Sequence, residues 1–306
     1  MSFLYLLAGL RSPFLNQVML LVTEMGDETI LLICGLTLFW CLDKRWGYRV
    51  MAVAFMAMGL TMLIKVLVMQ PRPWVLDPAF QAVEAAKGRA YDYSFPSGHS
   101  STSAALFGML ALYSEKKPLK VLFPCCALLV GFSRMYLGVH TPQDVLTGLA
   151  IGFGCVLLSR PLLDRAEKTP RATTALQLCL VGFLALSLVI QLLKPASARS
   201  DAELDAATLC DTGSLLGASL ALVLIQWLDR RYIRFANDTV WWLGLIRLFG
   251  GFALVMGVRM VLKAVLPTAV WSNALRYFMM MMAGGVAWTA CFPKLEKLRR
   301  DGGAGQ

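Results

Sequence analysis

The sequence predicts an all-α, polytopic bundle of transmembrane helices, from its composition and from the length and spacing of its apolar segments. Of 306 residues, 58% are hydrophobic and only 16% are charged, whereas soluble domains contain about 45–50% apolar and about 25% charged residues. The mean hydropathy is +0.62. Apolar runs near the length of around 20 residues that crosses a hydrocarbon core recur along the whole chain. These observations favour a membrane protein over a soluble one.

Nine spans are predicted. They cover residues 28–42, 48–68, 98–114, 118–138, 143–160, 172–193, 207–228, 240–262 and 274–292. Residues 13–27 carry acidic side chains and are expected to form an interfacial or re-entrant helix, or an extension of the first span. Residues 1–10 have neither a basic start nor a small-residue cleavage site, so no removable signal peptide is expected. The chain then divides into an N-terminal segment (1–27), a core that carries the chemical motifs (28–170) and C-terminal transmembrane helices (171–306).

Basic residues gather in alternate loops, and short cytoplasmic loops of membrane proteins collect lysine and arginine. The residues that define this pattern are Lys44, Arg45, Arg49, Lys116, Lys117, Lys120, Arg160, Arg165, Lys168, Arg171, Arg230, Arg231, Arg234, Lys294, Lys297, Arg299 and Arg300. They predict an outside N-terminus and a cytoplasmic C-terminus. The net charge of +10 then mostly reflects the orientation of the chain in the membrane, and anionic lipid headgroups are the expected partner of the basic residues. No motif supports nucleic-acid binding.

The eight cysteines lie in or at the edges of apolar spans without metal-ligand spacing, which predicts small core hydrophobes. Charged residues also fall within the C-terminal spans and need partners there: Asp211, Arg247, Arg259 and Arg276. We expect an ion pair between Asp211 and Arg259, at comparable depth on neighbouring spans. These charges serve bundle assembly or, alternatively, substrate binding. Glu24 and Asp27 are expected to border the entrance of a site.

Three clusters of polar residues carry the chemistry, and they contain both histidines of the chain. Six residues separate Lys65 from Arg72, and the prolines on either side of Arg72 hold its guanidinium in a defined turn. The run Pro96-Ser97-Gly98-His99 opens an apolar helix, whose first backbone N–H groups bind phosphate readily. The third cluster is Ser133-Arg134, followed by His140 and Asp144.

The segment after His140 is typical of a helix start, with Thr141 as N-cap, Pro142 at the first helical position and Asp144 at the third. A carboxylate there can reach back to one imidazole nitrogen of His140 and leave the other with a free lone pair. A neutral, oriented histidine is a competent nucleophile toward phosphorus. Each motif also has a structural interpretation: turn, capping box or a snorkelling Lys65. Those interpretations do not explain why both histidines occur in such clusters.

These motifs resemble the type 2 phosphatidic acid phosphatase superfamily, the lipid phosphate phosphatases, whose core is related to vanadium haloperoxidases. The family pattern is matched at Lys65, Arg72, Pro73, Pro96, Ser97, Gly98, His99, Ser133, Arg134, His140 and Asp144. The resemblance covers about residues 28–165 and implies a six-helix-type phosphatase core. Nine spans with an outside N-terminus are most similar to the branch of sphingoid-base phosphate phosphatases and glucose-6-phosphatase.

The resemblance implies a role for each matched residue. His140 attacks phosphorus and forms a phosphohistidine, Asp144 orients it, and His99 protonates the leaving oxygen and then activates water. The phosphate oxygens are held by Lys65, Arg72, Ser97, the Gly98 amide and Arg134. No cluster with the spacing of divalent-metal ligands competes with this scheme, so neither a metal nor a cofactor is expected.

The expected substrates are amphiphiles whose phosphate lies at headgroup level: a sphingoid or diacylglycerol phosphate, a lysophospholipid phosphate or a polyprenyl diphosphate. A soluble ester is a further candidate. The alternatives are a lipid phosphotransferase and a protein that binds or translocates a lipid phosphate without cleaving it. Short loops favour a bacterial inner membrane, with the site on the non-cytoplasmic side. The oligomeric state cannot be predicted from these residues.

Overall fold

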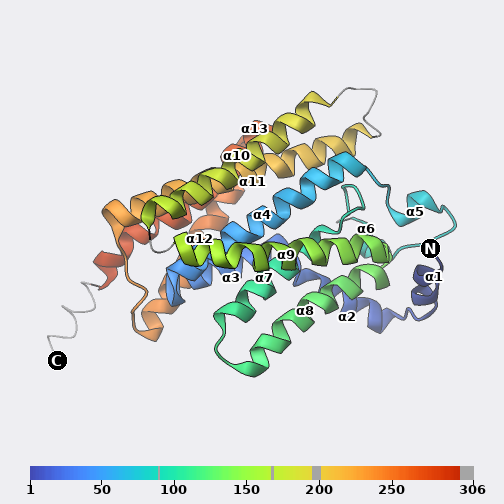
Figure 1. Ribbon diagram of the computed structural model, residues 1–306, viewed down its shortest axis with the longest axis horizontal. Helices are drawn as coiled ribbons and strands as arrows, with labels where there is room; N and C mark the ends of the chain where they lie inside the picture. Colours follow the sequence, from blue (N-terminus) through green and yellow to red (C-terminus); the bar gives the residue numbers. More distant parts are fainter. Residues whose placement is uncertain (89, 167–168, 195–200, 297–306) are drawn as a thin grey trace.

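The computed structural model describes residues 1–88, 90–166, 169–194 and 201–296. Every regular element within these ranges is helical, as the composition predicts, and the long helices run along a common axis (Figure 1). Helices occupy all nine predicted spans. Among the described residues, six helices are long and apolar enough to cross a membrane, and one broken pair would make a seventh. Nine full crossings therefore remain a prediction.

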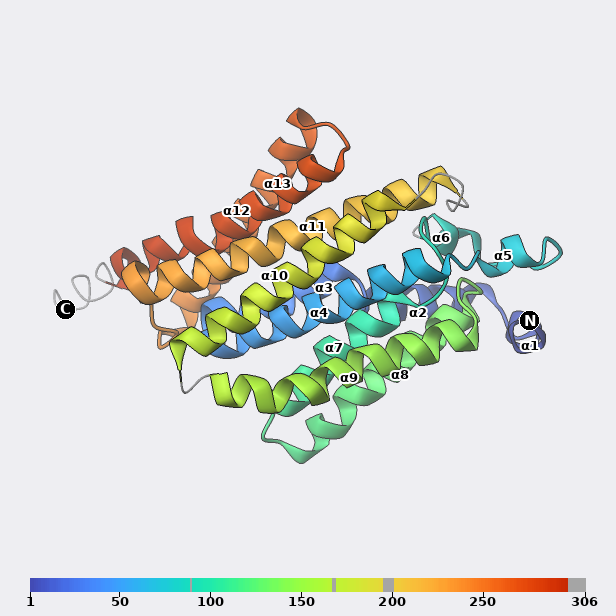
Figure 2. The ribbon, with the colours of Figure 1, turned by 45° about the horizontal axis from the view of Figure 1, so that its top comes forward.

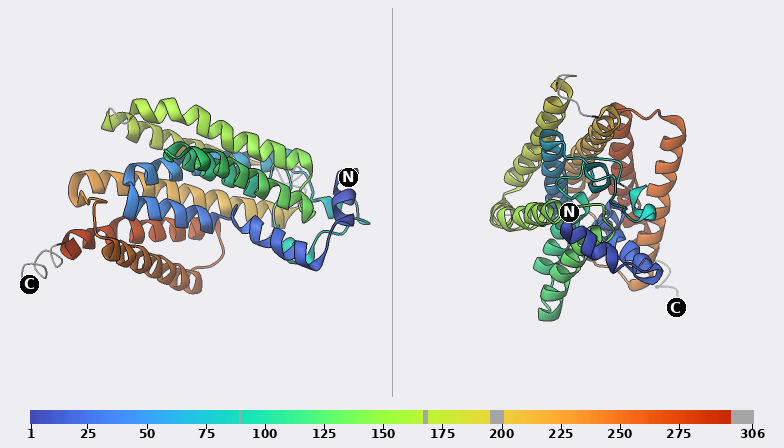
Figure 3. Two further views of the ribbon diagram at one scale, coloured as in Figure 1. Left: turned by 90° about the horizontal axis from the view of Figure 1, so that it is seen from below. Right: turned by 90° about the vertical axis from the view of Figure 1, so that its right-hand side faces the viewer.

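The first two helices lie at one end of the molecule, away from the last described residues (Figure 3). Helix α1 (Ser2–Gly9) is followed by α2 (Pro13–Glu24) and α3 (Glu28–Thr37), which continues as a π-helical turn, η1 (Leu38–Leu42). Ser12 caps α2 by accepting a hydrogen bond from the N–H of Leu15 at 3.2 Å. Helices α2 and α3 meet at a bend of 48°. The segment expected to be interfacial, re-entrant or part of the first span is thus a helix joined to that span by a bend.

Helix α4 (Lys44–Val68) lies between the two halves of the bundle (Figure 2). It begins at Asp43, whose carboxylate accepts from the N–H of Arg45 at 2.9 Å, and ends at Met69, which has a positive φ of 51°. Short helices α5 (Pro73–Leu76) and α6 (Glu84–Lys87) follow. One side of α4 packs against α7 (Gly98–Tyr113) and α9 (Pro142–Ala166), the other against α10 (Pro170–Leu193) and α11 (Ala202–Leu228). Helix α8 (Lys117–Tyr136) completes the first half.

Two glycines bring α9 into backbone contact with the start of α7. A Cβ atom at Gly148 would lie 2.5 Å from the carbonyl oxygen of Ser97, and one at Gly152 would lie 2.4 Å from that of Ser101. Only glycine permits such an approach, as in the small-residue interfaces of membrane helices. This contact places the loop before α9, which carries His140, beside the first turn of α7, which carries His99.

The second half contains α11, α12 (Trp241–Val265) and α13 (Val270–Met282), with η3 (Asp229–Ile233), η4 (Ala283–Ala287) and η5 (Thr289–Cys291). The largest hydrophobic cluster joins it to η1 and α4, and Trp40 Nε1 donates to the carbonyl of Gly284 at 3.0 Å. All eight cysteines are free, but Cys125, Cys179 and Cys291 are exposed rather than in the core, because an apolar residue on a membrane helix has no need to face inward. Four of the basic residues that predict the orientation lie outside the described residues: Lys168, Lys297, Arg299 and Arg300.

Candidate active site

The three sequence clusters meet at one cavity of about 400 Å³ near the C-terminal end of α4. It receives side chains from α4, α7, α8 and the loops before α5 and α9. Six of the predicted site residues line it: Lys65, Arg72, Gly98, His99, Arg134 and His140. Residues far apart in the sequence therefore share one space, as the motifs predict.

The carboxylate of Asp144 is fully buried behind His140. Its Oδ2 atom lies 3.4 Å from Nδ1 of His140 and accepts hydrogen bonds from the N–H of Thr141 at 2.8 Å and the hydroxyl of Ser94 at 2.6 Å. The N–H of Asp144 donates in return to the Thr141 hydroxyl at 3.3 Å. The predicted helix start is therefore present, and it aims the carboxylate at the imidazole. Ser94 had no sequence signal, because it lies in a loop without periodicity.

The other imidazole nitrogen of His140 faces Arg72. Nη1 of Arg72 lies 2.9 Å from Nε2 of His140 and also donates to the carbonyl of Val139 at 2.9 Å. A guanidinium can only donate, so Nε2 carries the lone pair and Nδ1 carries the proton toward Asp144. Burial, followed by the charge of Arg72, lowers the pKa of His140 well below its ordinary value. The imidazole is thus neutral at neutral pH, with its lone pair on the cavity side.

Asp92, which no motif indicated, holds the two cations of the first cluster together. Its Oδ2 atom lies 3.1 Å from Nζ of Lys65, and its Oδ1 atom pairs with Nη2 of Arg72. Lys65 also donates to the carbonyl of Tyr93 and is only 1% exposed. Burial raises the pKa of Asp92, but Lys65 and Arg72 together hold it well below its ordinary value. The ionised carboxylate of Asp92 therefore forms ion pairs with Lys65 and Arg72, the two cations that were predicted to bind phosphate.

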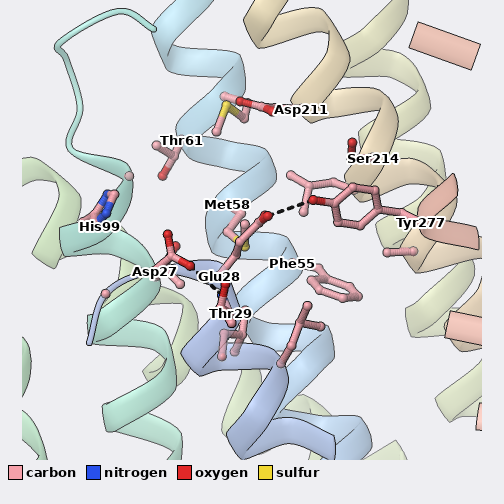
Figure 4. A pocket seen from close by; sticks show the side chains of 18 of the residues that line it. Asp27, Glu28, Thr29, Phe55, Met58, Thr61, His99, Asp211, Ser214 and Tyr277 are labelled. Carbon is pink, nitrogen blue, oxygen red and sulfur yellow. Dashed lines mark hydrogen bonds between the residues drawn. The ribbon is translucent and has the colours of Figure 1, made fainter. Parts of the chain in front are cut away.

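The first turn of α7 supplies His99 and the backbone of Gly98. A Cβ atom at Gly98 would meet nothing within 4 Å, so the space beside this part of the backbone is open. His99 lies at the edge of the cavity (Figure 4). Ser97 is placed differently from the expectation, because it is fully buried and its hydroxyl caps the helix by accepting from the N–H of Ser100 at 3.4 Å. It contributes the helix start rather than a surface of the cavity.

Helix α2 also reaches the site and contributes a contact between Thr23 and Arg134 that the sequence did not predict. Arg134 is 2% exposed, and its Nη1 atom donates to the hydroxyl of Thr23 at 2.9 Å. Glu24 and Asp27 line the cavity, as expected for residues at its border. The N-terminal segment therefore positions an arginine of the site in addition to covering it. A single threonine in an apolar helix gives no sequence signal for that role.

The C-terminal half forms the opposite wall of the cavity. Tyr277 donates to Oε1 of Glu28 at 2.8 Å across the two halves (Figure 4). The expected Asp211–Arg259 ion pair is wrong: both residues line the cavity, but no such pair forms between them. Equal depth in a bundle does not set the direction in which each helix turns its side chain.

Two other arginines of this half have structural partners. Arg247 pairs with Glu296 at 2.9 Å, and Arg276 donates to the side chain of Asn273 at 2.9 Å. The interpretation as bundle assembly therefore applies to Arg247, whereas the bond of Arg276 lies within helix α13. In the part of the chain that the structure describes, no group of three or more histidine, cysteine or acidic side chains is arranged to hold a metal ion.

Comparison with known proteins agrees with this geometry. Residues 46–168 match the PAP2 superfamily, and residues 211–300 match the transmembrane extension of PAP2 superfamily phosphatases. The second match covers the half of the chain to which no motif could be assigned. No solved structure shows a significant match to the chain.

Several curated relatives are phosphatases. The chain is 34% identical to phosphatidylglycerophosphatase B of Bacillus subtilis over 47% of its own length and 72% of that protein. It is 28% identical to glucose-6-phosphatase 3 of Mus musculus over 69% of its own length and 72% of that protein. It is also 28% identical to sphingosine-1-phosphate phosphatase 1 of Rattus norvegicus, over 52% of its own length but only 38% of that protein.

The matched core contains Lys65, Arg72, His99, Arg134 and His140, the residues that converge on the cavity. The relatives confirm the family predicted from the motifs, and several apolar helices place the chain among membrane proteins. The chain therefore belongs to the PAP2 superfamily and is a membrane phosphatase with that family's transmembrane extension.

Proposed function

We propose that the protein hydrolyses phosphate monoesters or diphosphates of amphiphilic lipids through a phosphohistidine formed on His140. The observation that supports this most directly is the state of His140: Asp144 faces one ring nitrogen, and the lone pair of the other faces Arg72 within the cavity. A neutral histidine oriented in this way is a competent nucleophile toward phosphorus once Arg72 releases its lone pair.

In the proposed first step, Nε2 of His140 attacks phosphorus in line while the bond between phosphorus and the leaving oxygen breaks. His99 donates a proton to that oxygen. In the second step His99 accepts a proton from water, the water oxygen bonds to phosphorus, the P–N bond breaks, and inorganic phosphate leaves. Asp144 keeps the proton of Nδ1 directed away from the substrate in both steps.

Lys65, Arg72, Arg134 and the amide of Gly98 are proposed to hold the phosphoryl oxygens. Charge spreads over these oxygens in the transition state, and fixed donors stabilise it there. The phosphoryl group competes with Asp92 for Lys65 and Arg72, because the carboxylate already binds both cations. As Arg72 turns its N–H toward a phosphoryl oxygen, it releases the lone pair of His140 for attack. One arginine thus couples substrate binding to the availability of the nucleophile.

The walls of the cavity favour an amphiphilic substrate. Phe55, Met58, Leu215 and Met280 line it together with the charged residues, so an apolar chain can lie next to the phosphate. Relatives named for phosphatidylglycerol phosphate and sphingosine 1-phosphate support a lipid substrate. The relative named for glucose 6-phosphate keeps a soluble ester as the second candidate.

The basic loops support a cytoplasmic C-terminus, an outside N-terminus and a site on the non-cytoplasmic side of a bacterial inner membrane. In agreement with this arrangement, Lys44 and Arg45 of one basic loop and Arg230 and Arg234 of another lie together at the end of α4 remote from His140.

The test is phosphate release by detergent-purified protein from a panel of lipid phosphates, diphosphates and soluble esters, with EDTA present. We expect metal-independent release that is lost in His140→Ala and kept in Arg165→Ala, which replaces an exposed residue outside the cavity. Equal release by wild type and His140→Ala would exclude the mechanism. Transfer of phosphate to an added alcohol in place of water would indicate a phosphotransferase, and binding without turnover would indicate a carrier.

A further inference from the structure

A second cavity, of about 420 Å³, lies at the other end of α4. Side chains of α4, α9, α10, α11 and η3 surround it. Lys44 lines this cavity and Lys65 lines the active site, and at 1.5 Å per residue these positions are about 30 Å apart along the helix. The second cavity contains neither histidine, so it is not part of the phosphatase site.

Several buried polar groups of the residues that line this cavity have no hydrogen-bond partner within the described residues. The hydroxyl of Tyr48 and the Oε1 atoms of Gln177 and Gln226 accept or donate no hydrogen bond within the described residues. Their side chains are 6%, 6% and 5% exposed. Asp229 adds a fourth oxygen, Oδ1, because only its Oδ2 atom binds Lys44, at 2.7 Å. Unpaired polar groups inside a protein are costly, and three acceptor oxygens in one space call for a ligand that brings hydrogen-bond donors.

The cavity is strongly cationic. Five basic residues and one carboxylate line it: Lys44, Arg45, Arg49, Arg230, Arg234 and Asp229. Lys44 binds Asp229, and Arg49 binds Asp164 at 3.0 Å, so these two cations are neutralised in place. Arg45, Arg230 and Arg234 are exposed, and Arg45 also lies 3.7 Å from the carboxylate of Asp43. Their charge at the mouth of the cavity attracts an anion.

The remaining wall is apolar and includes Met56, Leu162, Leu163, Leu176 and Leu180. Leu162 is 48% exposed, so the apolar wall continues to the outer face of the helices. A ligand that fits all three regions has a negative charge, hydroxyl donors and a hydrocarbon part. Basic pockets between transmembrane helices recognise anionic headgroups in this way.

We propose that this cavity binds the headgroup of an anionic phospholipid with a hydroxylated headgroup, from the leaflet opposite the active site. The phosphate lies against Arg45, Arg230 and Arg234, the headgroup hydroxyls donate to the glutamine and aspartate oxygens, and an acyl chain follows the leucines. The lipid then bridges the central helix α4, helix α9 on one side of it, and helices α10 and α11 on the other. This inference does not depend on the role of His140.

The experiment uses the full chain, delipidated in detergent, and follows its melting temperature and native mass spectrum with four probes. These are phosphatidylglycerol, phosphatidylcholine, glycerol 3-phosphate and inorganic phosphate. We expect phosphatidylglycerol to raise the melting temperature and to remain bound in the mass spectrum, because a ligand of the folded state stabilises it. Phosphatidylcholine has no net charge, and the two soluble anions have no acyl chain. None of these three probes should therefore raise the melting temperature as much as phosphatidylglycerol does.

Arg45→Ala combined with Arg234→Ala should weaken phosphatidylglycerol binding on the order of 30-fold, from about fivefold per surface arginine. The matched control, Arg165→Ala with Arg231→Ala, removes the same charge from exposed residues that do not line the cavity and should leave binding within about twofold.

Gln226→Leu provides a readout that does not change the charge. It should raise the melting temperature without lipid, because it removes an unpaired buried group, and should reduce the preference for phosphatidylglycerol over phosphatidic acid, which has no headgroup hydroxyl. Equal stabilisation of both double variants by phosphatidylglycerol, or equal stabilisation of wild type by all four probes, would overturn the proposal. Stabilisation by inorganic phosphate alone would show a site for a free anion and would overturn the lipid assignment.

Discussion

Nη1 of Arg72 lies 2.9 Å from Nε2 of His140, so a phosphate-binding cation of the family motif directly contacts the nitrogen proposed to attack phosphorus. The same guanidinium pairs with Asp92. Because arginine only donates, the contact assigns the lone pair of the imidazole to Nε2. Arg72 thus contacts both the nucleophile His140 and the carboxylate of Asp92, and it is proposed to bind the phosphoryl group as well.

Asp144→Asn should lower kcat on the order of 10³-fold and change KM little, because an amide at this position no longer favours the tautomer with its proton on Nδ1. Initial rates on a saturating lipid phosphate measure the effect. Ser94→Ala is the matched control, since it removes a different hydrogen bond to the same carboxylate, of 2.6 Å. If Ser94→Ala lost as much activity as Asp144→Asn, the carboxylate would act mainly through packing of its loop.

Asp92→Asn should lower KM for lipid phosphates and strengthen inhibition by inorganic phosphate, each by about tenfold, because the carboxylate no longer competes for Lys65 and Arg72. Steady-state kinetics with added phosphate provide the measurement. Glu84→Gln removes an exposed carboxylate that pairs with Lys87 outside the cavity and should change neither constant. A higher KM in Asp92→Asn would mean that Asp92 positions the two cations rather than competing for them.

The acidic limb of the kcat/KM profile should lie well below pH 6.5, the ordinary pKa of histidine. Burial and the nearby cations lower the pKa of His140, so the imidazole stays neutral and nucleophilic as the pH falls through that value. In Arg134→Ala, which removes one of these cations, the limb should move to higher pH.

Stability should follow the same pKa with a defined sign. Below about pH 6.5 the unfolded chain takes up a proton at His140 that the folded chain does not. This residue therefore lowers the free energy of unfolding as the pH decreases toward its depressed pKa, and His140→Gln should remove that contribution. Thermal unfolding of both proteins across this range measures it, and identical pH dependence in the two would contradict the assignment.

Gly152→Ala should lower both the melting temperature and the activity, because its Cβ atom would lie 2.4 Å from the carbonyl of Ser101 and force α9 away from α7. A loss of several degrees is expected for the clash, and the distance between His99 and His140 should change with it. Gly154→Ala is the control on the same helix. A Cβ atom there meets nothing within 4 Å, so this variant should be neutral or slightly more stable.

The helices and the main chemical groups of the site could be predicted because each rests on a local pattern. The lengths of the apolar runs predicted the spans. The N-cap at Thr141, with Asp144 at the third helical position, predicted where the carboxylate lies relative to His140. The prolines around Arg72 ended α4 and turned the guanidinium into the cavity. In these cases the information lies within a few residues of chain.

The remaining features depend on tertiary geometry. Asp92 and Ser94 lie in an irregular loop, whose conformation follows from no periodicity. Thr23 contacts Arg134 only because α2 bends back over the site. The expected Asp211–Arg259 pair failed because depth along a helix does not determine rotation about its axis, whereas side-chain direction changes by about 100° per residue.

The most direct test of the central claim is to trap the covalent intermediate. Wild type and His99→Ala are mixed with a lipid phosphate carrying a ³²P label, quenched in alkali, which preserves phosphohistidine, and mapped by peptide mass spectrometry. The account predicts label on His140 in wild type, and in His99→Ala a label on the same residue that both forms and disappears more slowly, because His99 serves both steps. Turnover of the substrate by wild type with no label on His140, or label on another residue, would contradict it.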